Sequence, residues 1–274
     1  MLPLDRALED MGVKFTRYAD DLLFWSNNYR NASMAVEALY EWSKKSGVQV
    51  NTSKSGGLRL MVAETKPEPE IESIESVDYL GHRISLKAVQ PKPSRLESVK
   101  VEIERLIYVT LLKEPTQGTQ QVTRIYGGLD RDYISLIWQL RRRLYGRLSE
   151  HQVQRLRRGY VPATGLTGIV AQFPVVTDRE QYRLLDVWLR RRVWLALRRR
   201  ALFLGPLLGH RDPPKVWNLP LEELMTAQAR SVTTGQSLDL TMPSARIMAE
   251  LVQRSIQLHG PAVVRGSSRL YLEP

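Results

Sequence analysis

The amino-acid sequence predicts an α+β fold, in which β-hairpins and helices are followed by a mostly α-helical part. A β-prone apolar run within residues 13–25 bends near its middle, which is typical of a hairpin, and a similar run at residues 77–86 predicts a second hairpin or a bent strand. Beyond Pro93, apolar side chains recur every three or four residues, the period of amphipathic helices. Pro91 and Pro93 mark the change between the two parts, because proline ends strands and disrupts helix interiors.

Composition favours a soluble protein that binds a polyanion. The chain has 274 residues, with 40 Lys plus Arg against 29 Asp plus Glu, and a formal net charge of +11 favours nucleic acid as a partner. The absence of cysteine excludes a disulfide framework, a cysteine zinc site and a thiol nucleophile. No apolar run approaches the roughly 20 residues of a membrane helix, and no secretory signal pattern opens the chain. We therefore expect a cytoplasmic protein without a membrane partner.

The first elements in chain order are a helix and a hairpin. Residues 1–10 predict a helix with Gly12 just past its end, and the apolar face consists of Leu4, Leu8 and Met11. The hairpin strands follow, with Ala19, Asp20 and Asp21 near the bend. Neighbouring residues of a strand point to opposite faces, whereas two carboxylates in a turn can converge on one cation.

The carboxylates of Asp20 and Asp21 predict a metal site. Between apolar strands, two adjacent acids repel each other and resist ionisation unless a cation lies between them. Mg²⁺ prefers oxygen ligands, keeps several waters and takes substrate phosphates as further ligands. The alternative is a surface turn in which both carboxylates face solvent.

Four elements are predicted between the two hairpins. A helix ends at Gly47, and its apolar stripe consists of Ala35, Leu39 and Trp42. Residues 48–50 and 58–63 are expected to form strands. Residues 64–75 are rich in proline and glutamate and are expected to form an exposed loop.

The stretch Tyr18-Ala19-Asp20-Asp21, placed between strands, resembles the YxDD signature, motif C, of reverse transcriptases. Its YADD form and the flanking residues 4–9 and 13–17 are similar to bacterial group II intron reverse transcriptases. The resemblance implies an RNA-directed DNA polymerase that uses Mg²⁺ and deoxynucleoside triphosphates on an RNA template and a DNA primer. It implies that Asp20 and Asp21 are catalytic metal ligands and that Tyr18 contacts nucleic acid.

Two further motifs extend the resemblance to about residue 90. The block around residues 48–57 resembles motif D, and Lys54 takes the position of a lysine that would protonate the leaving pyrophosphate. A solvated turn lysine is the alternative. Residues 77–86 resemble motif E, the primer grip, which implies nucleic-acid contacts by Gly81, His82 and Arg83. His82 has no neighbouring His or Cys, which favours packing or a phosphate contact over a metal.

The helical part begins with two amphipathic patterns. Ser94 is expected to cap the first helix together with Glu97, and its stripe consists of Leu96, Val99, Ile103, Leu106 and Ile107. Residues 115–118 are expected to break it. The stripe of the second helix consists of Tyr133, Ile137, Leu140, Leu144 and Leu148, with Arg141, Arg142 and Arg143 on its other sides. By position these helices resemble a reverse transcriptase thumb, which implies nucleic-acid contacts by the three arginines.

Arginine clusters recur beyond Ser149. Leu185, Leu189, Val193 and Leu197 are spaced to form a buried stripe, flanked by arginine triplets at 190–192 and 198–200. Residues 185–194 resemble the maturase-specific region of group II intron proteins, which implies RNA contacts by Arg190, Arg191 and Arg192. A solvated face is the alternative. Helices are expected at 221–226 and 244–258, with no assigned chemistry.

The predicted domains are a partial palm at 1–90, a thumb at 91–150 and a basic helical maturase-like region at 151–274. Polymerases of this type hold two metals with carboxylates from two separate strands, and Asp20 and Asp21 supply only one strand. Asp78 falls in the motif E match, and Asp130 and Asp132 in the second thumb helix. We expect motif A and the fingers to lie before Met1, so that the chain needs a complementary N-terminal segment and is inactive alone.

Two other functions fit the same residues. The first is a non-catalytic, maturase-type protein that binds structured intron RNA and assists splicing. The second is a diverged reverse transcriptase that acts in phage defence or alongside adaptive immunity genes. All three predict a basic protein bound to nucleic acid. The maturase-type protein does not need Asp20, whereas the sequence does not separate the defence-associated reverse transcriptase from the first function.

Overall fold

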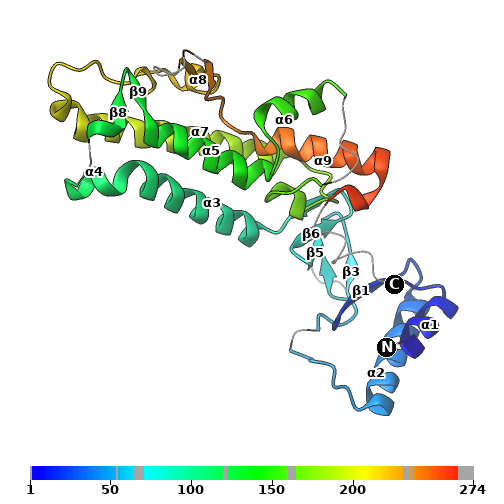
Figure 1. The fold of residues 1–274 in the computed structure, drawn as a ribbon. Coiled ribbons are helices and arrows are strands. Elements are labelled where there is room, and N and C mark those ends of the chain that lie inside the picture. The colour runs from blue at the N-terminus through cyan, green and yellow to red at the C-terminus, as the bar shows by residue number, and fades with distance from the viewer. Residues whose placement is uncertain are drawn as a thin grey trace. The chain divides into compact units, whose positions relative to one another are not determined.

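The computed structural model describes residues 2–53, 55–64, 71–119, 122–159, 165–230, 235 and 237–264. The chain divides into two compact units, residues 1–88 and 89–274. Both contain helices and short strands, which agrees with the predicted α+β class (Figure 1). No helix in the described ranges is both long and apolar enough to cross a membrane.

In its described residues the first unit has two helices and three strand pairs. Its elements are α1 (Leu2–Asp10), β1 (Lys14–Tyr18), β2 (Asp21–Trp25), α2 (Tyr29–Ser46), β3 (Leu60–Met61), β4 (Ser73–Ile74), β5 (Ser76–Tyr79) and β6 (His82–Ser85). The pairs β1–β2 and β5–β6 are antiparallel, and β3–β4 is parallel. The predicted first helix and the first hairpin are therefore confirmed, and of the two alternatives for residues 77–86 the structure has the hairpin.

The core of the first unit lies between α1, α2 and the first hairpin. Its buried residues are Leu4, Leu8, Val13 and Ala35, and the side chains packed against them are Met11, Phe15, Leu22, Phe24, Leu39 and Trp42. The predicted apolar stripes of both helices supply most of this list. Gly47 ends α2 with a φ of +74°, a backbone conformation that glycine adopts without steric cost.

One strand prediction in this unit is wrong, and another is confirmed over a shorter range. Residues 48–50 form no strand, because side chains at the end of α2 take the backbone groups of Val48: Ser43 Oγ donates to its carbonyl at 2.5 Å, and its N–H donates to Ser46 Oγ at 3.3 Å. The strand predicted at 58–63 shortens to β3. Its partner β4 comes from the segment expected to be a loop, because Leu60 and Met61 pair there with Ser73 and Ile74.

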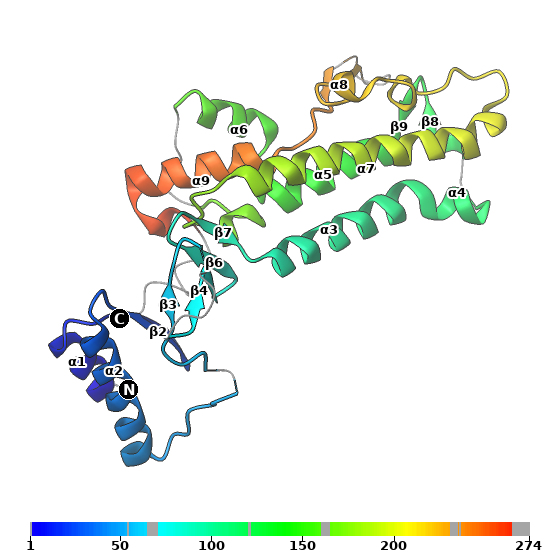
Figure 2. The same cartoon turned by 180° about the vertical axis from the view of Figure 1, so that it is seen from behind.

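The second unit is mostly helical. Its helices and strands are β7 (Val89–Pro91), α3 (Pro93–Ile107), a π-helical turn (Tyr108–Leu112), α4 (Lys113–Gln117), β8 (Ile125–Tyr126), β9 (Leu129–Asp130), α5 (Arg131–Tyr145), α6 (Glu150–Arg157), α7 (Glu180–Leu204), α8 (Leu221–Leu224), β10 (Gln228–Arg230), β11 (Ser237–Asp239) and α9 (Ala245–His259). Short 3₁₀ turns lie at 122–124, 170–172, 205–208, 215–217 and 261–263. Figures 1 and 2 show α3, α5 and α7 running alongside one another.

One hydrophobic core connects the helices of the second unit, with buried residues from Leu96 to Val264. The stripe predicted for α7 is confirmed, because Leu185, Leu189, Val193 and Leu197 are all buried. The stripes of α3 and α5 are buried as expected at Ile103, Ile107, Tyr133, Ile137, Leu140 and Leu144. The helix predicted at 244–258 is α9, whose N-cap is Ser244. The boundary proposed at residue 150 between thumb and C-terminal region stays a prediction.

Details of the helix ends differ from expectation. Ser94 does not cap α3: the N-cap is Lys92 without a side-chain hydrogen bond, because Pro93 has the fixed φ that suits the first helical position. Glu97 instead pairs with Lys100 at 2.6 Å. The predicted break at residues 115–118 is confirmed: a π-helical turn leads from α3 into α4, which ends at Gln117 with Gly118 as its C-cap.

A buried ion pair crosses the core of the second unit. Arg200, expected among flanking arginines, is fully buried, and its Nε donates to Asp130 Oδ2 at 2.7 Å. The same guanidinium donates to Asp132 Oδ2 at 2.7 Å and to the Leu111 carbonyl at 2.6 Å. Asp130 also accepts a hydrogen bond of 2.8 Å from the Trp217 indole and caps α5. Each buried charge therefore has a partner, as burial requires.

Candidate active site and nucleic-acid interface

The two carboxylates of the YADD stretch lie at the tip of the β1–β2 hairpin. Tyr18 pairs with Asp21, so Ala19 and Asp20 form a two-residue turn. Ala19 has a φ of +53°, the left-handed conformation that tight hairpin turns require. The predicted bend is confirmed, although the positive φ falls on Ala19 and not on an aspartate.

Asp20 and Asp21 are both exposed, and neither carboxylate forms a hydrogen bond or ion pair with a residue that the structure describes. The apolar neighbours suggested that both carboxylates are buried between the strands, and the structure shows that they are not. Two exposed carboxylates next to each other suit Mg²⁺, which binds one or two protein carboxylates and completes its shell with water and phosphate. Within the described ranges, no group of three or more His, Cys, Asp or Glu side chains could hold a metal ion.

An ion pair fixes the first strand of the hairpin to α1. Arg17 Nε lies 3.2 Å from Asp5 Oδ1, and its second nitrogen lies 2.8 Å from Oδ2. This is the two-point geometry that arginine and carboxylate favour. Both side chains are largely buried, with 25% and 15% exposed. The pair therefore holds the strand that precedes the carboxylates against a helix of the same unit.

A second anchor comes from the β5–β6 hairpin. The Tyr79 hydroxyl lies 3.2 Å from the carbonyl oxygen of Asp21 and 3.4 Å from that of Thr16. Burial raises the pKa of Tyr79, so its hydroxyl keeps the proton that it donates. The sequence does not single out Tyr79, because a tyrosine in a strand does not reveal which carbonyl its hydroxyl reaches. This contact links the motif E match to the carboxylate pair.

The residues predicted to contact nucleic acid from the motif E match differ in environment. Gly81 has a φ of +81° in the turn between β5 and β6. His82 is 3% exposed, its Nδ1 lies 3.2 Å from the Leu80 carbonyl, and burial lowers its pKa. This environment favours the packing role over a phosphate contact. Arg83 is paired with Asp78 at 2.9 Å. Lys54 lies outside the described residues.

The arginines predicted to bind RNA in the second unit fall into two groups. Arg141 is only 12% exposed and donates to Asp239 at 3.2 Å and to the Thr241 carbonyl at 2.7 Å. Two others pair with α3: Arg143 with Glu102, and Arg192 with Glu104. Arg142 and Arg191 are exposed and have no ion pair with the described residues, while Arg190 is half-buried. The structure therefore leaves Arg142 and Arg191 most available to a polyanion.

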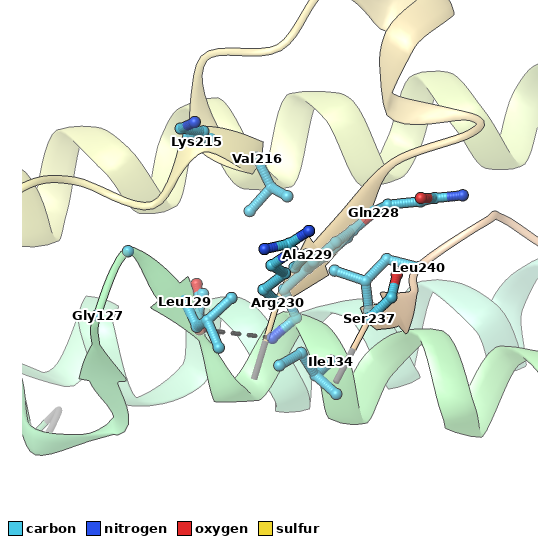
Figure 3. A pocket seen from close by; sticks show the side chains of 13 residues that line it. Gly127, Leu129, Ile134, Lys215, Val216, Gln228, Ala229, Arg230, Ser237 and Leu240 are labelled. Carbon is cyan, nitrogen blue, oxygen red and sulfur yellow. Dashed lines mark hydrogen bonds between the residues drawn. The ribbon is translucent and has the colours of Figure 1, made fainter. Parts of the chain in front are cut away.

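A pocket of about 530 Å³ opens in the second unit beside α5 (Figure 3). Apolar side chains such as Ile134, Val216 and Leu240 line it, together with the exposed cations Lys215 and Arg230. Tyr133 also lines it, and the buried Tyr133 hydroxyl has no hydrogen-bond partner among the described residues. The mixed lining would suit a ligand with an apolar body and a negative charge.

Comparison with known proteins gives one family. Residues 1–84 match the family model described as reverse transcriptase (RNA-dependent DNA polymerase). No curated protein and no solved structure matches the chain. The match covers the YADD hairpin, its α1 anchor and most of the β5–β6 hairpin, and it supports a reverse transcriptase domain in this part of the chain.

Proposed function

We propose that this chain is part of a group II intron-like reverse transcriptase that synthesises DNA on an RNA template from a DNA primer. The family match of residues 1–84 supports this, and so does the exposed pair of carboxylates at the tip of the β1–β2 hairpin. The carboxylate pair carries the proposal, because metal-dependent nucleotidyl transfer requires adjacent oxygen ligands.

In this proposal Asp20 and Asp21 hold Mg²⁺. The metal would activate the primer 3′-hydroxyl and stabilise charge on the leaving pyrophosphate of a deoxynucleoside triphosphate. The contribution of the other residues is to position the two carboxylates. The ion pair of Arg17 with Asp5 fixes strand β1, which precedes the carboxylates, and Tyr79 fixes the backbone of Asp21 itself. Lys54 is proposed as the proton donor to pyrophosphate.

The proposed site is half of a complete one. A second strand must contribute a further carboxylate, which we assign to a motif A segment outside this sequence. The fingers, with their triphosphate-binding basic residues, belong to the same complementary segment. The proposal predicts that synthesis depends on supplying that segment in trans.

Co-expression tests the proposal. The chain would be produced with a fingers-palm segment that carries motif A, and incorporation of deoxynucleotides on an RNA template would be measured with and without Mg²⁺. We expect synthesis only from the combination, and we expect Asp20→Ala to abolish it. Asp10→Ala is the matched control, because Asp10 is an exposed acid at the end of α1. Synthesis that survives Asp20→Ala would refute the assignment of Asp20.

A maturase-type RNA-binding protein is the second candidate. The exposed Arg142 and Arg191 favour it, because phosphate contacts by arginine give RNA affinity without any catalytic metal. In that case splicing assistance survives Asp20→Ala but falls when Arg190, Arg191 and Arg192 are changed to glutamine. Equal RNA affinity before and after the arginine changes would argue against it. A role in phage defence is compatible with either chemistry.

A further inference from the structure

The outward face of α5 carries an exposed tryptophan between two arginines. Arg131, Ser135, Trp138 and Arg142 are separated by four, three and four residues, which places them in one row along the helix. The row is about 16 Å long at the rise of an α-helix. The side chains of Arg131 and Arg142 are exposed, and Trp138 is 59% exposed.

Trp138 has no structural role comparable to that of the other tryptophans on helices. Trp42, Trp188 and Trp194 pack against the cores, and Trp217 is buried and bonded to Asp130. Trp138 shows no hydrogen bond, and no arginine stacks on its ring, within the part of the chain that the structure describes. An exposed tryptophan offers a large, flat apolar face, and such side chains are enriched where proteins bind ligands.

The charges beside Trp138 are available to a ligand. Neither Arg131 nor Arg142 forms an ion pair with any described residue, whereas Arg143 on another side of α5 pairs with Glu102. The nearest carboxylate in sequence, Asp132, faces Arg200 and is 13% exposed. The row therefore presents two unneutralised cations and no carboxylate of its own.

We propose that this row binds a single-stranded stretch of nucleic acid, with one base stacked on Trp138 and phosphates on Arg131 and Arg142. The choice of nucleic acid as ligand rests on the proposed function. A single strand is favoured over a duplex, because bases within a duplex already stack on each other and offer no free ring face. A partner helix would need carboxylates spaced to match Arg131 and Arg142, whereas phosphates recur along every nucleic-acid strand.

The pocket beside α5 extends this surface. Ile134 lines the pocket (Figure 3). It lies one helical turn before Trp138 on the same helix. Its lining cations, Lys215 and Arg230, are exposed and have no ion pair with the described residues. A strand that stacks on Trp138 would meet further positive charge on passing Ile134.

Binding of short oligonucleotides to the whole chain tests the proposal. Affinity would be measured by fluorescence anisotropy for a 12-nucleotide RNA, the same DNA sequence, and a hairpin duplex. We expect Trp138→Ala to weaken binding of both single strands about tenfold, the effect of one lost stacking contact, and to leave duplex binding unchanged. Trp138→Phe retains a ring and should restore most of the affinity.

A matched control uses Tyr108→Ala. Tyr108 is 46% exposed, but one turn before it lies the carboxylate of Glu104, which repels phosphate. Removal of the Tyr108 ring should therefore not change binding. Arg142→Gln should reduce the dependence of log affinity on log salt by about one unit. A thermal melt of each variant checks that it is folded. We expect unchanged melting, because an exposed ring contributes little to the stability of the fold.

Three outcomes would overturn this inference: equal single-strand affinity of Trp138→Ala and the wild type, an equal loss for single strand and duplex, or a change only in the oligomeric state. The proposed function fails separately. Absence of Mg²⁺-dependent synthesis with the complementary segment, together with Trp138-dependent binding, would refute the polymerase and leave this site standing. Asp20→Ala should not change single-strand binding.

Discussion

The Tyr79 hydroxyl lies 3.2 Å from the carbonyl oxygen of Asp21, so the second hairpin of the first unit holds the backbone of a proposed metal ligand. The contact joins residues that are 58 positions apart. It fixes the peptide on one side of the Asp21 side chain without using the carboxylate, which stays exposed. Tyr79 is therefore a positioning residue, and its effect should differ from that of a metal ligand.

Replacement of Tyr79 by phenylalanine should raise the Mg²⁺ concentration needed for half-maximal synthesis in the complemented enzyme. The variant loses one hydrogen bond and should destabilise the first unit by about 1 kcal/mol. A magnesium titration and chemical denaturation measure the two effects. Tyr40→Phe, on the exposed face of α2, is the control. A loss of stability with an unchanged magnesium requirement would limit Tyr79 to a structural role.

The coupling between Arg17 and Asp5 should be measurable by a double-mutant cycle. Arg17→Gln and Asp5→Asn should each reduce the free energy of unfolding, with a coupling of about 1 kcal/mol, because both side chains are mostly buried and share two hydrogen bonds. Urea denaturation of the wild type, both single variants and the double variant gives this number. Additive effects would mean that the pair does not hold the strand.

Ala19→Gly should stabilise the YADD hairpin. Ala19 has a φ of +53°, where a side chain costs about 1–2 kcal/mol, and glycine removes that cost at the expense of unfolded-state entropy. We expect a net gain of about 0.5–1 kcal/mol in the free energy of unfolding. Ala35→Gly, at a buried position within α2, should have the opposite sign. A destabilised Ala19→Gly would contradict the observed turn geometry.

Arg200→Met should destabilise the second unit by about 3–5 kcal/mol, because it leaves the buried carboxylate of Asp130 without its cation. Arg191→Met on the exposed face of the same helix should change stability by no more than about 0.5 kcal/mol. Adding Asp130→Asn to Arg200→Met should recover part of the loss. Thermal or urea denaturation checks all three, and equal effects of the two arginine changes would refute the buried pair.

The stability of the first unit should fall in mild acid because of His82. Burial lowers the pKa of His82 below its usual 6.5, so the neutral ring is favoured in the folded state. This contribution is fully present above pH 6.5 and is lost as the pH falls through the lowered pKa. His82→Gln should remove the dependence. Unfolding between pH 7.5 and pH 5 measures it, and the same slope in wild type and variant would contradict the prediction.

Periodicity identified most helices, because their apolar stripes determine which face packs. The spacing along α7 also indicates that Arg200 is buried. Arg200 follows Val193 by seven residues and Leu197 by three, which places it on the buried face. Read as one member of an arginine triplet, it looked like a solvated side chain. Its partner Asp130 is 70 residues away, and the sequence offers no measure of that distance in space.

The candidate site was predictable in its carboxylates but not in its supports. Two adjacent aspartates between β-prone runs indicate a hairpin tip, and the structure has one. Tyr79 and Asp5 act through contacts between elements, which local patterns do not encode. Arg141 is a similar case: Asp239 and Thr241, both about 100 residues later, draw its guanidinium away from solvent.

The Arg200 network also bears on the order in which the second unit is made. The network joins Leu111, Asp130, Arg200 and Trp217. Residues that share one of its hydrogen bonds lie up to 89 positions apart in the sequence. During synthesis, α3 and α5 leave the ribosome well before the cation and the indole that satisfy Asp130. We therefore expect these helices to stay sensitive to protease until Trp217 has emerged, so that the second unit acquires its native packing late and in one step.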